Sequence, residues 1–336
     1  MSGFRAAFIT PDRVNAPGRW GVMDVYRWRR EDLWPPLFIE ELADIWSVAT
    51  DQLHRTDRDG GRVWFRGSSL FSMPVRAVAV DADGYSYVAG GEGVRKVDPD
   101  GDEVWTYTQG MSGTMRTVQV AGDGQVYAAD SSGNVHRIAQ NGSQNLFIEQ
   151  VTRLGEAVEE ITVDANGFIY VGGLDDRVWK LDTDGEVVWE MTRHTNNVRC
   201  VAVDGRGNVY SGGSDNRLIK TDRWGDHEWT FTGHWDTVNG VAVDADGYVY
   251  TASSDGTVRK LSRRGREIWR STRHSGHATA VAVDVDGNVF SGGEDRSVRR
   301  LNKDGEQVWS YTRHYWQATI RGIAVAPGIH AAGHGW

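Results

Sequence analysis

One motif returns seven times along this chain of 336 residues and limits what the chain can fold into. Each complete copy has an alternating apolar segment such as VAVD, a turn, a second alternating segment and a short ending such as SGG. The copies begin at Val78, Val118, Ile161, Val201, Val241, Val281 and, in degraded form, Ile323. A spacing of 40 to 43 residues, with several short strands in each unit, predicts a β-propeller.

The copy that begins at Val241 shows how one unit is built. GVAVD alternates between apolar and polar or small residues, as a strand with two different faces does. DADG follows as a hairpin turn, in which Asp bonds its own backbone and Gly accepts a positive φ. YVYTAS, TVRKLS and REIWRST then give three more strands, separated by turns. Four strands in one repeat make one blade.

The two ends of the repeat region predict how the ring closes. The copy at Ile323 stops after two strands, whereas LHRTDRDGGRVWFRG, from Leu53, matches the second half of a unit. We therefore expect the C-terminus to supply the two inner strands of one blade and the N-terminus the two outer strands. IWSVATD, from Ile45, also resembles a second strand and competes with GIHAAGH for that position. The predicted fold is an all-β, seven-bladed propeller with four-stranded blades and no unpaired edge.

Residues 1–45 do not fit the repeat, so we divide the chain into an N-terminal arm at 1–45 and a propeller at 46–336. A short helix is expected at 36–45, where PPLFIEELAD places apolar residues on one face. The arm either packs on the propeller itself or anchors the chain to a partner subunit. The anchor hypothesis rests on four aromatic residues: Trp20, Trp28, Trp34 and Phe38.

Composition bears on the partners and the location. A net charge of −9 argues against nucleic acid as a partner, because nucleic-acid binding needs a basic surface. No apolar run has the length of a membrane span, and the N-terminus lacks a signal-peptide pattern. We therefore expect no membrane insertion, no secretion, and a place in the cytoplasm or in a particle assembled there. The single cysteine, Cys200, cannot form an internal disulfide and is expected in a blade core.

The segment GHWDTVNGVAVDADGYVYTASSDGTVRKLS resembles the WD40 propeller repeat. The shared features are Gly-His before the first strand, a hydroxyl residue in the second strand and Asp in the second turn. The resemblance implies a hydrogen-bonded network that pins each blade. Its members here would be His194, Ser211 and Asp215; His234, Thr251 and Asp255; and His274, Ser291 and Asp295. His314 has the same position before the last copy, but no matching Asp follows it.

The repeats depart from WD40 at the Trp-Asp dipeptide, where Leu181-Asp182 and Thr221-Asp222 stand instead. Tryptophan closes the fourth strand, at Trp64, Trp105, Trp189, Trp229, Trp269 and Trp309. This pattern resembles quinoprotein-type (PQQ-like) repeats, and the resemblance implies that each indole docks between blades.

We expect no catalytic residue, cofactor or metal, and hence no enzyme. The spaced histidines lie on different blades, and neither HSGH (His274, His277) nor HAAGH (His330, His334) has a second ligand pair for zinc. The DADG-type turns imitate the start of a calcium loop but lack its later oxygen ligands. A quinone enzyme is the enzymatic alternative, although no site motif beyond the repeats supports it.

The loops at one end of the blades are the candidate interaction surface. Its expected contact residues are Met111, Met115, Asn196, Asn197, Trp235, His277, Tyr315 and Trp316. Trp, Tyr and Met are typical anchors of protein contacts, although they can also pack against their own loops.

Taken together, these features predict a non-enzymatic interaction scaffold. Our leading hypothesis is a structural component of a virus particle, in its tail, baseplate or capsid decoration, with a loop face that binds a partner or host. Its partners would be other subunits of the assembly, with homo-oligomers possible within the particle. The alternatives are a cytoplasmic WD40-type assembly scaffold and a quinone- or sugar-binding propeller.

Overall fold

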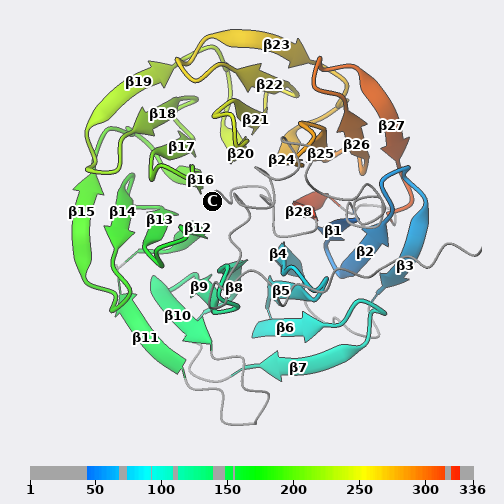
Figure 1. The fold of residues 1–336 in the computed structure, drawn as a ribbon, viewed down its shortest axis with the longest axis horizontal. Coiled ribbons are helices and arrows are strands. Elements are labelled where there is room, and N and C mark those ends of the chain that lie inside the picture. The colour runs from blue at the N-terminus through cyan, green and yellow to red at the C-terminus, as the bar shows by residue number, and fades with distance from the viewer. Residues whose placement is uncertain are drawn as a thin grey trace, which may run out of the picture. The chain divides into compact units, whose positions relative to one another are not determined.

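The structure, a computed structural model, describes residues 44–67, 74–91, 93–108, 113–138, 148–153, 156–314 and 319–325. The regular structure in these segments is entirely β, in seven antiparallel sheets of four strands each. Figure 1 shows the sheets arranged as blades around a common axis. The predicted seven-bladed propeller is confirmed.

Four concentric sets of strands build the ring. The innermost strands are β28 (Ile320–Val325), β4 (Val75–Val80), β8 (Met115–Val120), β12 (Val158–Val163), β16 (Val198–Val203), β20 (Val238–Val243) and β24 (Ala278–Val283). The second strands are β1 (Ile45–Ala49), β5 (Ser86–Gly90), β9 (Val126–Asp130), β13 (Ile169–Gly173), β17 (Val209–Gly213), β21 (Val249–Ser253) and β25 (Val289–Gly293).

The outer half of each blade is built in the same way. The third strands are β2 (Gln52–Thr56), β6 (Gly93–Val97), β10 (Asn134–Ile138), β14 (Val178–Leu181), β18 (Leu218–Thr221), β22 (Val258–Leu261) and β26 (Val298–Leu301). The outermost strands are β3 (Arg62–Arg66), β7 (Glu103–Tyr107), β11 (Ile148–Arg153), β15 (Val187–Met191), β19 (His227–Phe231), β23 (Glu267–Ser271) and β27 (Gln307–Tyr311).

The closing blade joins the two ends of the chain in one sheet, with strand order β28-β1-β2-β3. The blue β1 lies beside the red β28 in Figure 1. β28 also contacts β4 of the next blade, so the inner strands form a continuous ring. The expected closure is confirmed, but the split of two strands from each terminus is wrong. The C-terminus supplies one strand and the N-terminus three.

Residues Ile45–Ala49 take the contested second position because all five side chains of β1 are buried there. A tight turn at Thr50, with φ of 46°, sends the chain directly into β2. Ile45 lies in this strand, so the helix expected at 36–45 does not include its last residue. Asp44, just before Ile45, is not helical either, and residues 1–43 and the segment GIHAAGH lie outside the described residues.

The hydrophobic core lies between neighbouring blades. One cluster joins Tyr250 and Val258 of the β20–β23 blade to Val281, Val289 and Leu301 of the next. Each of these side chains is at most 1% exposed. Burial of a large apolar side chain contributes about 1.5–3 kcal/mol, so the stacking of blades, more than any single sheet, stabilises the ring.

Six of the seven outermost strands, all except β11, contain a tryptophan, and five of these indoles bond to the following blade. The indole Nε1 of Trp269 donates to the carbonyl of Lys303 at 2.9 Å, and the ring lies over Gly305 in that turn. The other indoles that donate to the next blade are Trp64, Trp189, Trp229 and Trp309. Trp105 has the same strand position, and the turn of its neighbouring blade lies outside the described residues. The geometry is that implied by the PQQ-like repeat.

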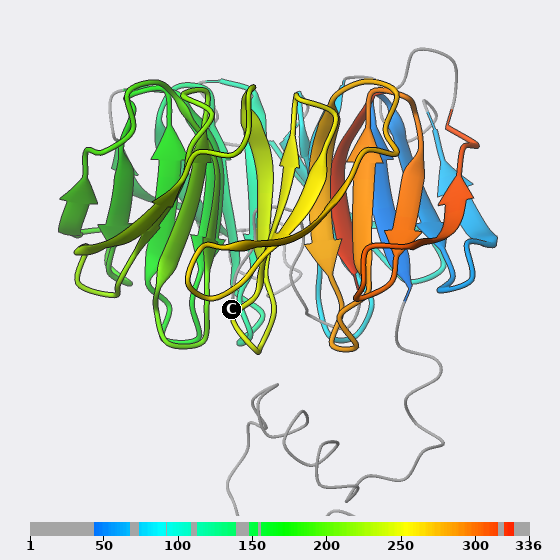
Figure 2. The same cartoon turned by 90° about the horizontal axis from the view of Figure 1, so that it is seen from above.

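The strands run between two faces of the ring, which is seen edge-on in Figure 2. We call loop face the end at which each outermost strand passes to the next innermost strand. It includes the connections 192–197, 232–237 and 272–277, together with the turns between second and third strands. The opposite end, with the first and third turns of each blade, is called the turn face.

Candidate interaction surface

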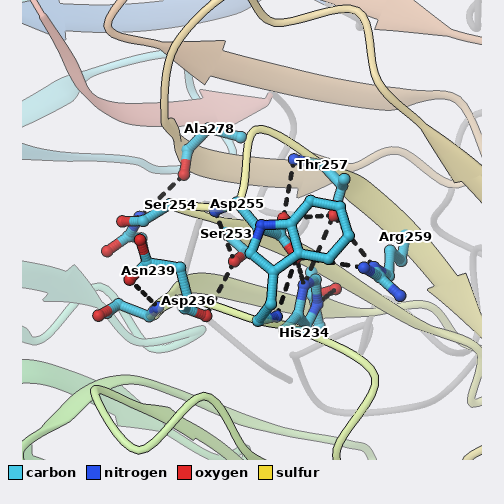
Figure 3. Close-up of polar contacts among 12 residues, drawn as sticks. His234, Asp236, Asn239, Ser253, Ser254, Asp255, Thr257, Arg259 and Ala278 are labelled. Carbon is cyan, nitrogen blue, oxygen red and sulfur yellow. Dashed lines mark hydrogen bonds and ion pairs between the residues drawn. The ribbon is translucent and has the colours of Figure 1, made fainter.

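A buried histidine holds each of three consecutive loop connections. In the β20–β23 blade, His234 Nδ1 donates to Asp255 at 2.8 Å (Figure 3), and Nε2 pairs with the Thr251 hydroxyl at 2.8 Å. His194 makes the same contacts with Asp215 and Ser211 at 3.0 and 2.8 Å. His274 pairs with Asp295 and Ser291 at 3.0 and 2.9 Å. The structure thus brings together all nine residues implied by the WD40 resemblance.

The network also fixes the residue that follows each histidine. The backbone N–H groups of Thr195, Trp235 and Ser275 donate to the aspartates of their own blades at 3.1, 3.4 and 3.2 Å. In the β20–β23 blade the Ser253 hydroxyl also donates to the carbonyl of Asp236 at 3.0 Å. Three successive loop tips are therefore held by hydrogen bonds to buried carboxylates, and such charged hydrogen bonds are stronger than neutral ones.

Electrostatics favour the ionised aspartate in these networks. Burial raises the pKa of the Asp255 carboxyl, but hydrogen bonds from His234 and Thr257 outweigh burial and hold that pKa well below its usual range. The pKa of Asp295 is also held low against burial, by hydrogen bonds from His274, Ser297 and Arg299. The networks therefore remain charged at neutral pH, and the loop tips stay fixed.

Two arginines extend the networks, and the sequence analysis missed both. Arg259 is only 2% exposed, and its guanidinium contacts Asp255 at 3.1 Å (Figure 3). The same guanidinium contacts Glu267 at 2.7 Å. Arg299 contacts Asp295 in the same way at 2.8 Å. The β16–β19 blade has Ile219 at this position. The sequence did contain a signal for this contact, since each arginine stands four residues after the aspartate of the second turn.

The closing blade uses a different set of polar residues. His54 Nδ1 lies 2.8 Å from the Tyr311 hydroxyl, and His54 Nε2 lies 3.0 Å from Gln52 Oε1. The rings of His54 and His314 contact each other with their centroids 4.0 Å apart. Burial, and secondarily Arg62, lowers the pKa of His54 to about 4, while burial and His54 lower that of His314 well below its usual value. Both imidazoles are therefore neutral at pH 7.

The predicted contact residues divide into three groups. Trp235 is 66% exposed at the tip of its loop. Asn196 and His277 are exposed on adjoining loops, where Asn197 is half-buried and His277 lies 3.4 Å from Glu294. Met115 is fully buried, so its assignment to the contact surface is wrong; it begins β8 and its side chain fills the core beside Tyr107.

The remaining predicted contact and anchor residues lie outside the described residues. They are Met111, Tyr315, Trp316, Trp20, Trp28, Trp34 and Phe38.

A second exposed tryptophan was missed by the sequence analysis. Trp224 lies in the turn between β18 and β19, on the turn face, and is also 66% exposed. The Arg223 guanidinium lies 4.2 Å from its ring centroid. Trp224 and Trp235 are thus two tryptophans with equally exposed side chains, one on each face of the ring.

Within the described segments, no group of three or more His, Cys, Asp or Glu side chains is arranged to hold a metal ion. Cys200 is buried, and burial raises the pKa of its thiol, so it is not a reactive nucleophile. The part of the chain that the structure describes has no helix that could cross a membrane.

Fold and networks together define the class of protein, a seven-bladed β-propeller with polar networks between its loops and second strands. The family model "WD domain, G-beta repeat" matches residues 185–220, and the PQQ-type model "Outer membrane protein assembly factor BamB" matches residues 225–328. The chain is accordingly a propeller of WD40-like and PQQ-like repeats, as its sequence predicted.

A solved structure supports the fold. The crystal structure of the WD40 β-propeller domain of Doa1 has a TM-score of 0.65 and 18% sequence identity to this chain. The match covers 77% of this chain and 90% of that one, and at this identity the likeness concerns the fold. The comparison with curated protein sequences returned no match.

Proposed function

We propose that the chain is a protein-interaction scaffold whose loop face binds a partner protein through Trp235 and the adjoining loop tips. One observation supports this proposal above all: a tryptophan that is 66% exposed sits on a loop fixed by the buried His234–Asp255 pair. A large aromatic side chain on a rigid support loses little conformational entropy on binding and is a typical energetic anchor.

The repeat itself separates a constant support from variable tips. The three loop connections read TRHTNNV, TGHWDTV and TRHSGHA. The histidine stays the same and remains buried, whereas the exposed residues after it change from blade to blade. Rigid scaffolds that present variable loops are the common design of recognition surfaces.

Trp224 offers a matched control for the experiment. The full-length tagged protein, W235A and W224A are expressed in the native cell, and the co-purifying proteins are quantified. We expect W235A to reduce recovery of the specific partner at least tenfold, because truncation of an anchor residue costs about 2 kcal/mol or more. W224A should retain it. Equal recovery with all three proteins, or loss with W224A alone, would rule out the loop face.

The finer assignments remain predictions. A role in the tail, baseplate or capsid of a virus particle, homo-oligomers within it, and location in the virion or the cytoplasm are supported by the sequence arguments alone. The same holds for the anchoring role of the arm and for the absence of enzymatic activity. Imaging of the purified native assembly would test the particle hypothesis, which requires this chain at fixed positions in the particle.

A further inference from the structure

All seven innermost strands have a β-bulge at the same place, next to the loop face. In β4, for example, Val75 pairs with Gly90 and Ala77 with Ala89, which leaves Arg76 without an opposite residue. The bulge is repeated in the other six innermost strands. Bulges redirect side chains, and here each bulge residue lines the central cavity.

The bulge residues give this cavity a strong positive charge. Five of the seven are charged: Arg76, Arg116, Glu159, Arg199 and Arg321. Four guanidinium groups thus surround the axis with one carboxylate among them.

Among the residues that the structure describes, only two of the four arginines form an ion pair with a carboxylate. Glu159 receives Arg116 on one oxygen at 2.7 Å and Arg199 on the other at 3.4 Å. Within the described residues, Arg76 and Arg321 have no carboxylate partner, and the Nε atoms of Arg76 and Arg116 are buried without a hydrogen bond. Burial lowers the pKa of Arg76, and the nearby charges of Arg116 and Arg321 lower it further.

The other groups around the cavity do not supply the missing negative charge. Burial raises the pKa of Glu160, the residue after Glu159, to about 8, so this carboxyl is mostly neutral at pH 7. The remaining two bulge positions hold uncharged residues that bond within the protein: Asn239 donates to the carbonyl of Ala278 (Figure 3), and Thr279 donates to that of Gly292. Four like charges with a single ionised counter-charge are unfavourable, and a bound anion would relieve their repulsion.

We propose that this arginine ring, Arg76, Arg116, Arg199 and Arg321, is a binding site for a small phosphate-type oxyanion such as diphosphate. The cavity has a volume of about 200 Å³. This is below the roughly 300–1,000 Å³ of sites for drug-sized ligands, so the site suits a small anion. The guanidinium fork matches phosphate oxygens, and a tetrahedral group presents oxygens to donors that converge from several blades.

Isothermal titration calorimetry of the full chain with sodium diphosphate at low ionic strength tests the site. We expect saturable one-site binding that R76Q and R321Q each weaken at least tenfold. R177Q is the matched control, because Arg177 lies just before β14, away from the cavity, and pairs with Glu190 of β15 at 2.7 Å with 42% of its side chain exposed. It should bind as the wild type does. Absence of wild-type binding, or equal weakening by R177Q, would overturn the proposal.

Two further measurements sharpen the test. Circular dichroism melting checks that each variant folds; Arg321 is exposed at the cavity, so R321Q provides a readout even where R76Q melts at a lower temperature. Citrate, a planar-carboxylate anion of similar charge, should bind at least tenfold more weakly than diphosphate. Equal affinity for citrate would refute the assignment to phosphate chemistry. The site is independent of Trp235, so W235A should bind diphosphate normally.

Discussion

Ser47 Oγ and His314 Nε2 lie 3.1 Å apart although 267 residues separate them in the chain. Ser47 has in the closing blade the strand position that Ser211, Thr251 and Ser291 have in theirs. The histidine thus reaches its hydroxyl partner only when β1 enters the blade that β28 begins. The blade network therefore fastens the two ends of the repeat region to each other.

Acid should weaken the closing blade. The folded pKa of His54 is about 4, against about 6.5 in the unfolded chain, so between these pH values the unfolded state binds more protons. The free energy of unfolding should then fall as the pH drops from 6.5 toward 4, by on the order of 3 kcal/mol for this histidine. Urea unfolding of the wild type and H54Q at pH 7.5, 5.5 and 4.5 should show their stability difference shrinking. A constant difference would contradict the prediction.

Two truncations should separate the arm from the closing strand. A chain that begins at Asp44 retains β1 and should melt cooperatively. A chain that begins at Thr50 lacks the buried side chains of Ile45, Trp46 and Val48. It should melt more than about 10 °C lower, since each buried apolar side chain contributes about 1.5–3 kcal/mol. Differential scanning calorimetry measures both. Similar melting temperatures would show that another segment fills the second position.

The contact between tryptophan and glycine should be measurable with a pair of alanine variants. Gly305 and Gly287 have φ of +85° and +77°, so alanine is strained equally at both. At Gly305 the added Cβ would lie 2.7 Å from Cδ2 of Trp269, whereas at Gly287 the nearest atom, Lys303 Cβ, is 3.8 Å away. We expect G305A to be less stable than G287A by about 1–3 kcal/mol in urea unfolding, the usual cost of overpacking. Equal losses would mean that the indole shifts freely.

Removal of the network aspartate should lower the free energy of unfolding more in a blade where a buried arginine pairs with that aspartate. D255A leaves Arg259 buried with only Glu267 as a carboxylate partner, and breaking a buried pair costs about 3–5 kcal/mol. D215A removes the same contact with histidine, but the neighbouring position holds Ile219, so a loss of about 1–3 kcal/mol is expected. Chemical denaturation compares the two variants. A larger loss in D215A would contradict this role of Arg259.

Much of the architecture could be predicted because it repeats within each unit. Strand alternation, the Asp-x-x-Gly turns and the 21-residue spacing from His234 to Asp255 are local features of one blade, and the seven copies of the repeat specify the blade count. The tryptophans of the outermost strands were placed correctly for the same reason. Trp269 contacts Gly305 because the tryptophan and the turn glycine recur in most units.

The sequence by itself thus determined the blades, their networks and the closure of the ring. Only the tertiary structure decided which segment takes the second strand of the closing blade. The two competing sequences have similar alternation, and the pairing of Ile45–Ala49 with both β2 and β28 is a long-range feature. The tertiary structure also decided that Met115 is buried and that Arg76 and Arg321 share one cavity. Alternation assigns a residue to a side of a strand, but a bulge and the curvature of the ring determine what that side faces.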